Sequence, residues 1–331
     1  MLKEGKNIVR KTFLLSLLVG LFFFGVLTTA RAAKLYVTNM SDDSVSVIMA
    51  TDWRQPTTWK VGKTITVGKM PHVPAISPDG KKLLVTMAGS DEVWVFDPAT
   101  DKLVKKIPVG IKPTHIIFSR DSKHAFVSLE TSQELAIIDA ASDSVVAKIP
   151  VGLEPHVPAL SPDGRLIYLG GGPGNVVFVI DPVSRKLADK IGPIAVPHVP
   201  EFSPTGKIAY VTSRGSNDLT LIDVSAKKII SKTDMGFNSH GLALAPDSRY
   251  LFISSEAADL VGVFDTQNHT LSAKIPVGTF PHLVKLNKDG RFAFTTNMKA
   301  NTVSVIDTAK RAVVATIKVG NGPGGIAILE E

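Results

Sequence analysis

The chain is built around one repeated stretch, Pro71-His72-Val73-Pro74-Ala75-Ile76-Ser77-Pro78-Asp79-Gly80. A close copy begins at Pro155, 84 residues later, and a shorter copy begins at Pro197, after 42 more. The periodic position is occupied every 42 residues without drift, by Pro71, Pro113, Pro155, Pro197, Ser239, Pro281 and Pro323. A constant period of this length indicates a repeat architecture in which each unit packs on its neighbours.

Each repeat unit has the residue pattern of four β-strands. In the unit that starts at Pro71, we expect strands at 73–77, 82–87, 92–96 and 102–109, with apolar residues alternating in the third. The turn Ser77-Pro78-Asp79-Gly80 separates the first two, because proline fixes φ and Asp-Gly tolerates the tight part. Four strands in about 42 residues are typical of a propeller blade.

The two ends of the chain complete each other. Residues 34–68 supply the second, third and fourth strands of a blade, and residues 323–329 supply only a first strand. The sequence therefore predicts an all-β, seven-bladed β-propeller with four-stranded antiparallel blades. We expect one domain over residues 33–331, closed by pairing of the N-terminal strands with the C-terminal strand, which removes an open sheet edge.

Several motifs resemble a known repeat family. They are Leu35-Tyr36-Val37-Thr38-Asn39, its echo Ala209-Tyr210-Val211-Thr212-Ser213, the Ser-Pro-Asp-Gly turns, and the Ile-Pro-Val-Gly strand ends such as Ile107 to Gly110. These resemble the YVTN-family β-propeller repeat of YncE-like exported proteins. More distantly, the pattern is similar to the d-type haem propeller domain of dissimilatory nitrite reductase. The resemblance implies the fold, and it leaves the function open because the family is functionally mixed.

The first 32 residues have the composition of a signal peptide. A basic start is followed by an uncharged apolar run from Thr12 to Leu27, and Ala30 and Ala32 stand at the spacing of a signal-peptidase site. We expect cleavage after Ala32 and a periplasmic or secreted protein; the alternative is an uncleaved anchor. The chain contains no cysteine, which excludes covalent c-type haem and disulfides.

The mature chain has an ordinary charge balance. The full sequence has 37 basic and 30 acidic residues, and removal of five basic residues and one acidic residue leaves 32 and 29, a net charge of +3. The chain contains no run of basic residues of the kind that indicates nucleic-acid binding. After cleavage we expect no transmembrane segment, and a monomer whose partner is a small ligand or a periplasmic protein.

Histidines gather at the position after the periodic proline. In a propeller the first strand begins beside the central channel, so this residue lies at the channel mouth. Five of the seven positions are histidine, namely His72, His156, His198, His240 and His282, and the other two are Thr114 and Gly324. His115 is shifted by one residue, and because neighbouring strand residues face opposite ways, we expect it to lie outside this set.

The five histidines permit three interpretations. Neutral imidazoles aimed at one axis are good ligands for a transition metal such as copper, zinc or iron, or for non-covalent haem. They could instead bind an anion or a small polar molecule. Duplication of one blade would also copy a histidine without creating any site.

Other candidate ligands end the second strands near the same mouth. Arg214 could hold an anion, Glu130 and Glu256 could accept protons, and Met40 offers a thioether, while Thr114 fills a gap in the histidine set. The glycine-rich run from Gly170 to Gly174 leads into no helix, so we expect close backbone approach there rather than phosphate binding. No catalytic set emerges, so we expect a binding or scaffold protein, and enzymatic activity stays open.

One loop is six residues longer than its counterparts and carries Trp53 and Trp59. An exposed tryptophan pair would make the protein an interaction module that docks a partner. The other interpretation is that the tryptophans fold back over the blade edge near the ring closure. The binding protein therefore has two alternatives. One is a redox protein or enzyme with a metal or haem at the histidines, and the other is this interaction module.

Overall fold

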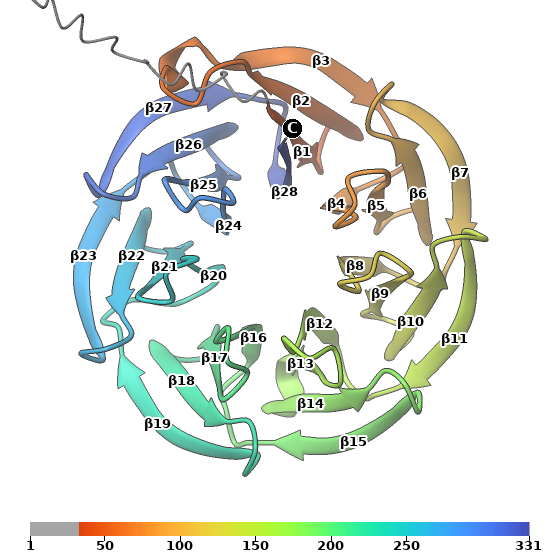
Figure 1. The fold of residues 1–331 in the computed structure, drawn as a ribbon, viewed down its shortest axis with the longest axis vertical. Helices are drawn as coiled ribbons and strands as arrows, with labels where there is room; N and C mark the ends of the chain where they lie inside the picture. The colour runs from red at the N-terminus through yellow and green to blue at the C-terminus, as the bar shows by residue number, and fades with distance from the viewer. Residues whose placement is uncertain (1–32, 331) are drawn as a thin grey trace, which may run out of the picture. The chain divides into compact units, whose positions relative to one another are not determined.

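Every unit of the 42-residue repeat forms one four-stranded antiparallel sheet. The computed structural model describes residues 33–330, and these form seven such sheets arranged in a ring around a central axis (Figure 1). The all-β, seven-bladed prediction is therefore confirmed. The expected signal peptide, residues 1–32, lies outside the described residues. Within the described part, no helix has the length and apolar composition needed to cross a bilayer.

Blades 1 to 6 follow one another along the chain, each with its four strands in order from the axis outward. Blade 1 has β4 (Pro71–Ile76), β5 (Leu83–Met87), β6 (Glu92–Asp97) and β7 (Lys102–Pro108). Blade 2 has β8 (Pro113–Phe118), β9 (His124–Leu129), β10 (Glu134–Asp139) and β11 (Ser144–Pro150). Blade 3 has β12 (Pro155–Leu160), β13 (Ile167–Gly171), β14 (Val176–Asp181) and β15 (Lys186–Ile191).

The second half of the ring repeats this order. Blade 4 has β16 (Pro197–Phe202), β17 (Ile208–Ser213), β18 (Asp218–Asp223) and β19 (Lys228–Asp234). Blade 5 has β20 (Leu242–Leu244), β21 (Tyr250–Ser255), β22 (Leu260–Asp265) and β23 (Thr270–Pro276). Blade 6 has β24 (Pro281–Leu286), β25 (Phe292–Asn297), β26 (Thr302–Asp307) and β27 (Ala312–Lys318).

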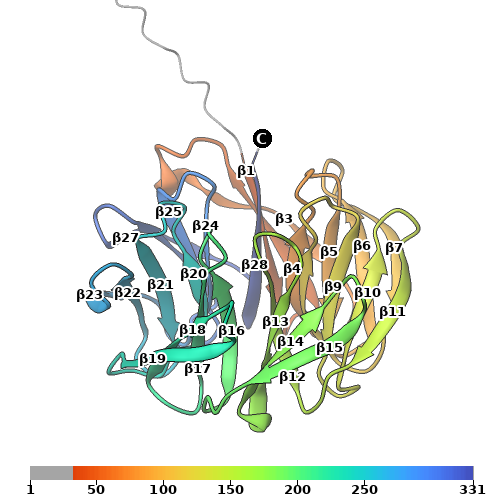
Figure 2. The ribbon, with the colours of Figure 1, turned by 60° about the horizontal axis from the view of Figure 1, so that its bottom comes forward.

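Blade 7 joins the two ends of the described chain. Its strands are β28 (Pro323–Glu330), β1 (Ala33–Asn39), β2 (Ser44–Ala50) and β3 (Lys60–Thr66). β28 pairs antiparallel with β1, so that Ala33 lies opposite Glu330 and Tyr36 opposite Ala327. Figure 2 shows β28 along the inner side of the ring. The expected closure is confirmed, and two short 3-10 turns, Pro56–Thr58 and Gly172–Gly174, complete the elements.

Burial changes from the axis to the rim as the residue pattern requires. The third strand of a blade, such as β10, is buried along its whole centre because neighbouring blades cover both of its faces. The outermost strand, such as β11, alternates between exposed and partly buried residues. Apolar clusters fill the spaces between adjacent blades, for example Phe126, Ile149 and Phe178 between blades 2 and 3.

The tryptophan loop seals the ring closure and does not form a docking point. Trp53 and Trp59 are only 9% and 4% exposed. Their rings lie 5.7–6.0 Å from those of Phe292 and Phe294 on β25 of blade 6. The Trp59 indole donates to the Asp52 carbonyl at 2.9 Å. The exposed-pair interpretation is wrong, because the apolar rings gain more from covering the neighbouring blade than they would in water.

In five of the seven blades, a hydroxyl side chain on the second strand donates a hydrogen bond to the next blade. Thr212 on β17 accepts the Val199 amide at 3.1 Å and donates to the His240 carbonyl at 2.7 Å. The same donation to the neighbouring blade is made by Thr38, Thr86, Ser254 and Thr296. These bonds fix the start of the first strand, and they thereby hold the histidine position in place.

Blade 3 replaces this hydroxyl by a glycine. Gly170 is the counterpart of Thr212, and a Cβ at residue 170 would lie 2.4 Å from the His198 carbonyl oxygen. Any side chain here would clash with the backbone of blade 4. The expected close backbone approach at the glycine-rich run is confirmed.

Candidate functional site: the histidine ring

Six imidazoles form a ring at the central axis. They come from the first strands of blades 1, 2, 3, 4 and 6 and from the segment before β20 in blade 5: His72, His115, His156, His198, His240 and His282. Consecutive ring centroids from His72 to His282 are 4.0–4.9 Å apart. The ring closes from His282 back to His72 at 6.0 Å. The structure thus brings the five predicted metal-ligand candidates together and adds a sixth.

The expectation that His115 lies outside the set is wrong. Its ring lies 4.9 Å from His72 and 4.5 Å from His156. Neighbouring side chains point to opposite faces only where strand pairing is regular. The pairing of β8 with β9 is interrupted between Pro113 and Ile116, and such irregularities redirect side chains. The same interruption occurs in β4, between Pro71 and Pro74, so irregular pairing at the strand start is shared by these two blades.

The two remaining predicted positions do not contribute a side chain to the ring. Thr114 is buried, and its hydroxyl lies 3.1 Å from that of Ser128 within its own blade. At Gly324 a Cβ would lie 2.8 Å from the Met40 sulfur. The Met40 thioether therefore occupies the space that a seventh side chain would fill, beside the wide step between His282 and His72.

Burial keeps these imidazoles neutral. Five of the six side chains belong to residues that are at most 8% exposed, and His156 is partly exposed. Loss of water lowers the pKa of His72 to about 4 and that of His282 to about 3. The same desolvation, with repulsion from neighbouring imidazoles, lowers the pKa of the other four well below 6.5. Neutral imidazole is the form that binds metals.

Much of the hydrogen-bonding capacity of the ring is unused. Among the described residues, buried ring nitrogens without a hydrogen-bond partner are His72 Nδ1, both nitrogens of His115, His156 Nδ1, both nitrogens of His198, and His240 Nε2. Buried polar atoms in proteins are normally paired, and an exception calls for a physical reason. Seven such atoms lie around one axis.

Blade 5 places a carboxylate against one side of the ring. Oε1 of Glu256 lies 3.2 Å from His240 Nε2 and 3.9 Å from His282 Nε2. Its other oxygen lies 3.6 Å from the Arg214 guanidinium. Desolvation raises the pKa of the Glu256 carboxyl, and the positive charge of Arg214 opposes that rise. Glu256 and Arg214, both predicted as candidate ligands, thus contact each other, and Glu256 also contacts the histidine ring.

Glu130 occupies the equivalent position three blades away. Its carboxylate forms an ion pair with Lys112, close enough to the ring for the Lys112 charge to lower the pKa of His72 and His156. Unlike Glu256, Glu130 forms no ion pair with a ring histidine among the described residues. Glu130 and Glu256, which stand at equivalent positions of the repeat, therefore have different surroundings.

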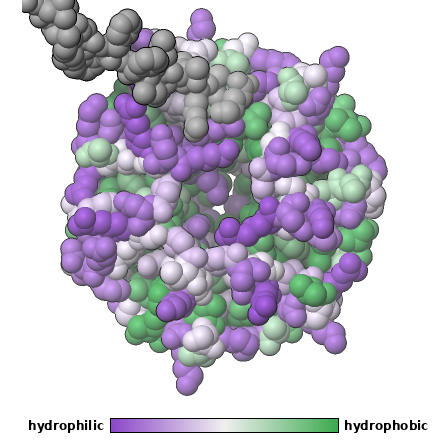
Figure 3. Space-filling view, in the orientation of Figure 1, coloured by the Kyte–Doolittle hydropathy of each residue, from purple (hydrophilic) through white to green (hydrophobic). Residues whose placement is uncertain are grey.

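The channel continues past the ring as an apolar cavity. It has a volume of about 260 Å³, is lined by His115 and by residues such as Val157 and Leu283, and ends near Glu201 and Lys285. Burial raises the pKa of the Glu201 carboxyl. Figure 3 shows an opening at the centre of the ring, bordered by hydrophilic side chains. Of the six ring histidines, His115 lines this cavity.

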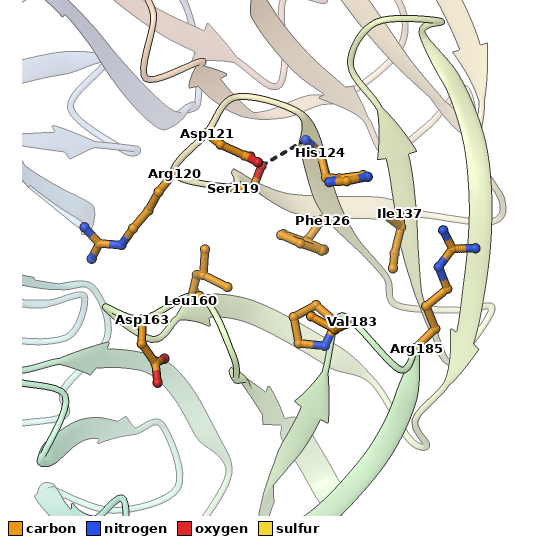
Figure 4. Close-up of a pocket in the computed structure, with 12 residues that line it drawn as sticks. Ser119, Arg120, Asp121, His124, Phe126, Ile137, Leu160, Asp163, Val183 and Arg185 are labelled. Carbon is orange, nitrogen blue, oxygen red and sulfur yellow. Dashed lines mark hydrogen bonds between the residues drawn. The ribbon is translucent and has the colours of Figure 1, made fainter.

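A larger cavity lies away from the axis. It has a volume of about 500 Å³ between blades 2 and 3, with Arg120 and Arg185 at its two ends and Phe126 between them (Figure 4). His124 lies at its edge, where its amide donates to the Ser119 hydroxyl at 2.9 Å. None of the buried unpaired polar atoms belongs to this cavity, so size alone does not make it the candidate site.

Two family descriptions match separate parts of the chain. Residues 24–114 match the YNCE-like beta-propeller family, and residues 155–313 match the family described as lactonase, 7-bladed beta-propeller. Among curated protein sequences, none matches.

Solved structures with the same fold cover most of the chain. Kuenenia stuttgartiensis hydrazine synthase matches with a TM-score of 0.76 and 25% identity, over 83% of this chain and 92% of the other. The periplasmic gluconolactonase PpgL of Pseudomonas aeruginosa matches with a TM-score of 0.76 and 18% identity, over 90% and 99%. Dihydro-heme d1 dehydrogenase NirN, solved in complex with DHE, matches with a TM-score of 0.65 and 16% identity, over 86% and 63%.

The two matches below 25% identity show the fold alone. Together with the family matches and the seven blades, they agree with the resemblance that the repeated motifs carry. The chain is a seven-bladed β-propeller, and its residues 24–114 are similar to the YNCE-like family.

Proposed function

We propose that this protein is an exported binding protein that holds a first-row transition-metal ion at the histidine ring. The single observation that carries the proposal is the set of seven buried imidazole nitrogens without partners. Each unpaired buried polar group costs about 1–3 kcal/mol, and a bound ion would use several of them at once. The lowered pKa values supply the neutral imidazoles that such an ion requires.

The packing favours an ion over a macrocycle. Neighbouring imidazoles in the ring are in contact, with centroids 4.0–4.9 Å apart, so a haem would have to separate them. A single ion requires no such separation. Non-covalent haem is the weaker form of this proposal.

Lactone hydrolysis is a second candidate. It is favoured by the match of residues 155–313 to the seven-bladed lactonase family and by the fold shared with PpgL. The test is hydrolysis of glucono-lactone by the mature protein, followed by acid release. Hydrolysis that survives removal of all metal would favour this candidate over metal binding as the function of the channel.

The metal proposal is tested on tag-free mature protein isolated from the exported fraction. Bound metals are quantified, the absorption spectrum is recorded, and uptake of copper, zinc, iron and haem is measured by titration. We expect one ion at the ring, and loss of uptake when His198 and His240 are both replaced by asparagine. His124→Asn, outside the ring, is the matched control and should bind normally. A metal-free protein that takes up none of these ions, or a double variant that binds like the wild type, would overturn the proposal.

A further inference from the structure

Within the ring, the histidines of blades 5 and 6 each place Nδ1 within hydrogen-bond distance of a carbonyl oxygen in the next blade. Nδ1 of His240 lies 3.0 Å from the His282 carbonyl oxygen, and Nδ1 of His282 lies 3.3 Å from the Gly324 carbonyl oxygen. A carbonyl only accepts hydrogen bonds, so Nδ1 carries the hydrogen in both rings. In a neutral imidazole this leaves a lone pair on Nε2. The same bond from Nδ1–H to a carbonyl orients most metal-binding histidines.

Both of these lone pairs face one carboxylate oxygen. Glu256 Oε1 lies 3.2 Å from Nε2 of His240 and 3.9 Å from Nε2 of His282, and all three atoms lie within 4.8 Å of one another. The His240 nitrogen is fully buried and makes no hydrogen bond despite this short separation. Lone pairs that face a carboxylate repel it unless a proton or a cation lies between them.

The spacing suits a cation. Ligand atoms bound at 2.0–2.2 Å in a tetrahedron lie about 3.3–3.6 Å apart, close to the separations of Oε1 from the two nitrogens. Arg214 holds the other carboxylate oxygen, Oε2, at 3.6 Å, which leaves Oε1 for the ion. The ring of His198 lies 4.0 Å from that of His240 and has two unpaired nitrogens, so it is placed to supply a fourth ligand.

We propose that His240, His282 and Glu256 form a site for one divalent cation of the zinc, cobalt or iron class, with Arg214 positioning the carboxylate. This inference rests on the proposed metal-binding function and assigns it to one sector of the ring. Two imidazoles and a carboxylate are a ligand set for borderline divalent ions rather than for soft copper(I). No other group of three histidine or acidic side chains with this spacing occurs in residues 33–330.

The test uses zinc and cobalt(II) as probes on metal-free, tag-free mature protein. Affinity is measured by calorimetry in two buffers of different ionisation enthalpy, which also counts the protons released on binding. Glu256→Gln should lower zinc affinity about 10–100-fold and change the visible cobalt(II) spectrum. Glu130→Gln, the equivalent position three blades away, should bind as the wild type does.

Each outcome separates this site from the wider proposal. If the wild type binds zinc and the Glu256→Gln and Glu130→Gln variants bind it with equal affinity, the Glu256 site is refuted. Metal binding by the ring would still stand. No uptake by the wild type would overturn both. If Glu256→Gln does not fold, as judged by its melting curve, Glu256→Asp takes its place. It keeps the charge but withdraws the oxygen, and an unchanged affinity in that variant would also refute the site.

Discussion

The stability of the metal-free protein should fall steeply between about pH 7 and pH 5. The cause is the set of buried imidazoles, whose pKa values are lowered by loss of water. In the unfolded chain a histidine with the ordinary value of 6.5 takes up a proton in this range, whereas the folded protein does not. The unfolded state therefore gains free energy as the pH falls. The contribution to stability is present above about pH 6.5 and is lost as the pH drops toward the folded pKa.

The magnitude follows from the two shifts that have values. A histidine whose pKa falls from 6.5 to about 4, as for His72, loses about 2 kcal/mol of stability between pH 7 and pH 5. His282, with a folded pKa of about 3, loses about the same. Together they remove about 4 kcal/mol, a large share of the 5–15 kcal/mol by which most domains are stable.

Other titrating groups do not mimic this loss. Aspartates that are stabilised by hydrogen bonds, such as Asp97, have pKa values below 3.8, so their contributions are lost only at lower pH. Glu256 and Glu201 have raised pKa values and act in the opposite direction, because their protonated forms favour the folded state as the pH falls.

The assay is denaturant unfolding in the presence of a chelator at pH 7 and at pH 5. For His72→Asn and His282→Asn, we expect the loss of unfolding free energy between the two values to shrink by about 2 kcal/mol each. His124→Asn, outside the ring, should keep the wild-type loss. Equal wild-type stability at both pH values, or ring variants that lose as much as the wild type, would refute the account of neutral buried imidazoles.

Three further predictions concern how the blades hold the site. Trp59→Ala should lower the free energy of unfolding by about 3–5 kcal/mol, because its ring packs on Phe292 at the ring closure; a change below 1 kcal/mol would contradict that packing. Gly170→Ala should cost about 1–3 kcal/mol or more, since the added Cβ meets a carbonyl oxygen at 2.4 Å, and denaturant midpoints would show it. Thr212→Val should cost about 1–3 kcal/mol by leaving the His240 carbonyl unpaired, and Thr308→Val, on the rim, should cost less in the same assay.

Most of the fold could be predicted from the repeat, because a 42-residue period with four strand patterns per unit is typical of propeller blades. The closure by β28 and β1 followed from which strands each terminus lacked. The fate of Trp53 and Trp59 could not follow in the same way, because the sequence does not show which side chains of blade 6 lie beneath the loop.

The candidate site was predicted only in part. Five histidines follow from the period, but the sixth, His115, depends on irregular pairing at the start of β8, which side-chain alternation does not describe. The sequence also did not show which residues contact Glu256. The sequence places Glu130 and Glu256 at equivalent positions, and only the fold shows that Lys112 engages one while Arg214 and two imidazoles surround the other.

Metal binding by the imidazole ring is tested by the metal content of tag-free mature protein before and after equilibrium dialysis against zinc and copper. We predict one tightly held ion per chain in the wild type, and none in a variant in which His156, His198, His240 and His282 are all replaced by asparagine. A wild-type protein that remains metal-free, or a quadruple variant that retains the ion, would contradict the claim.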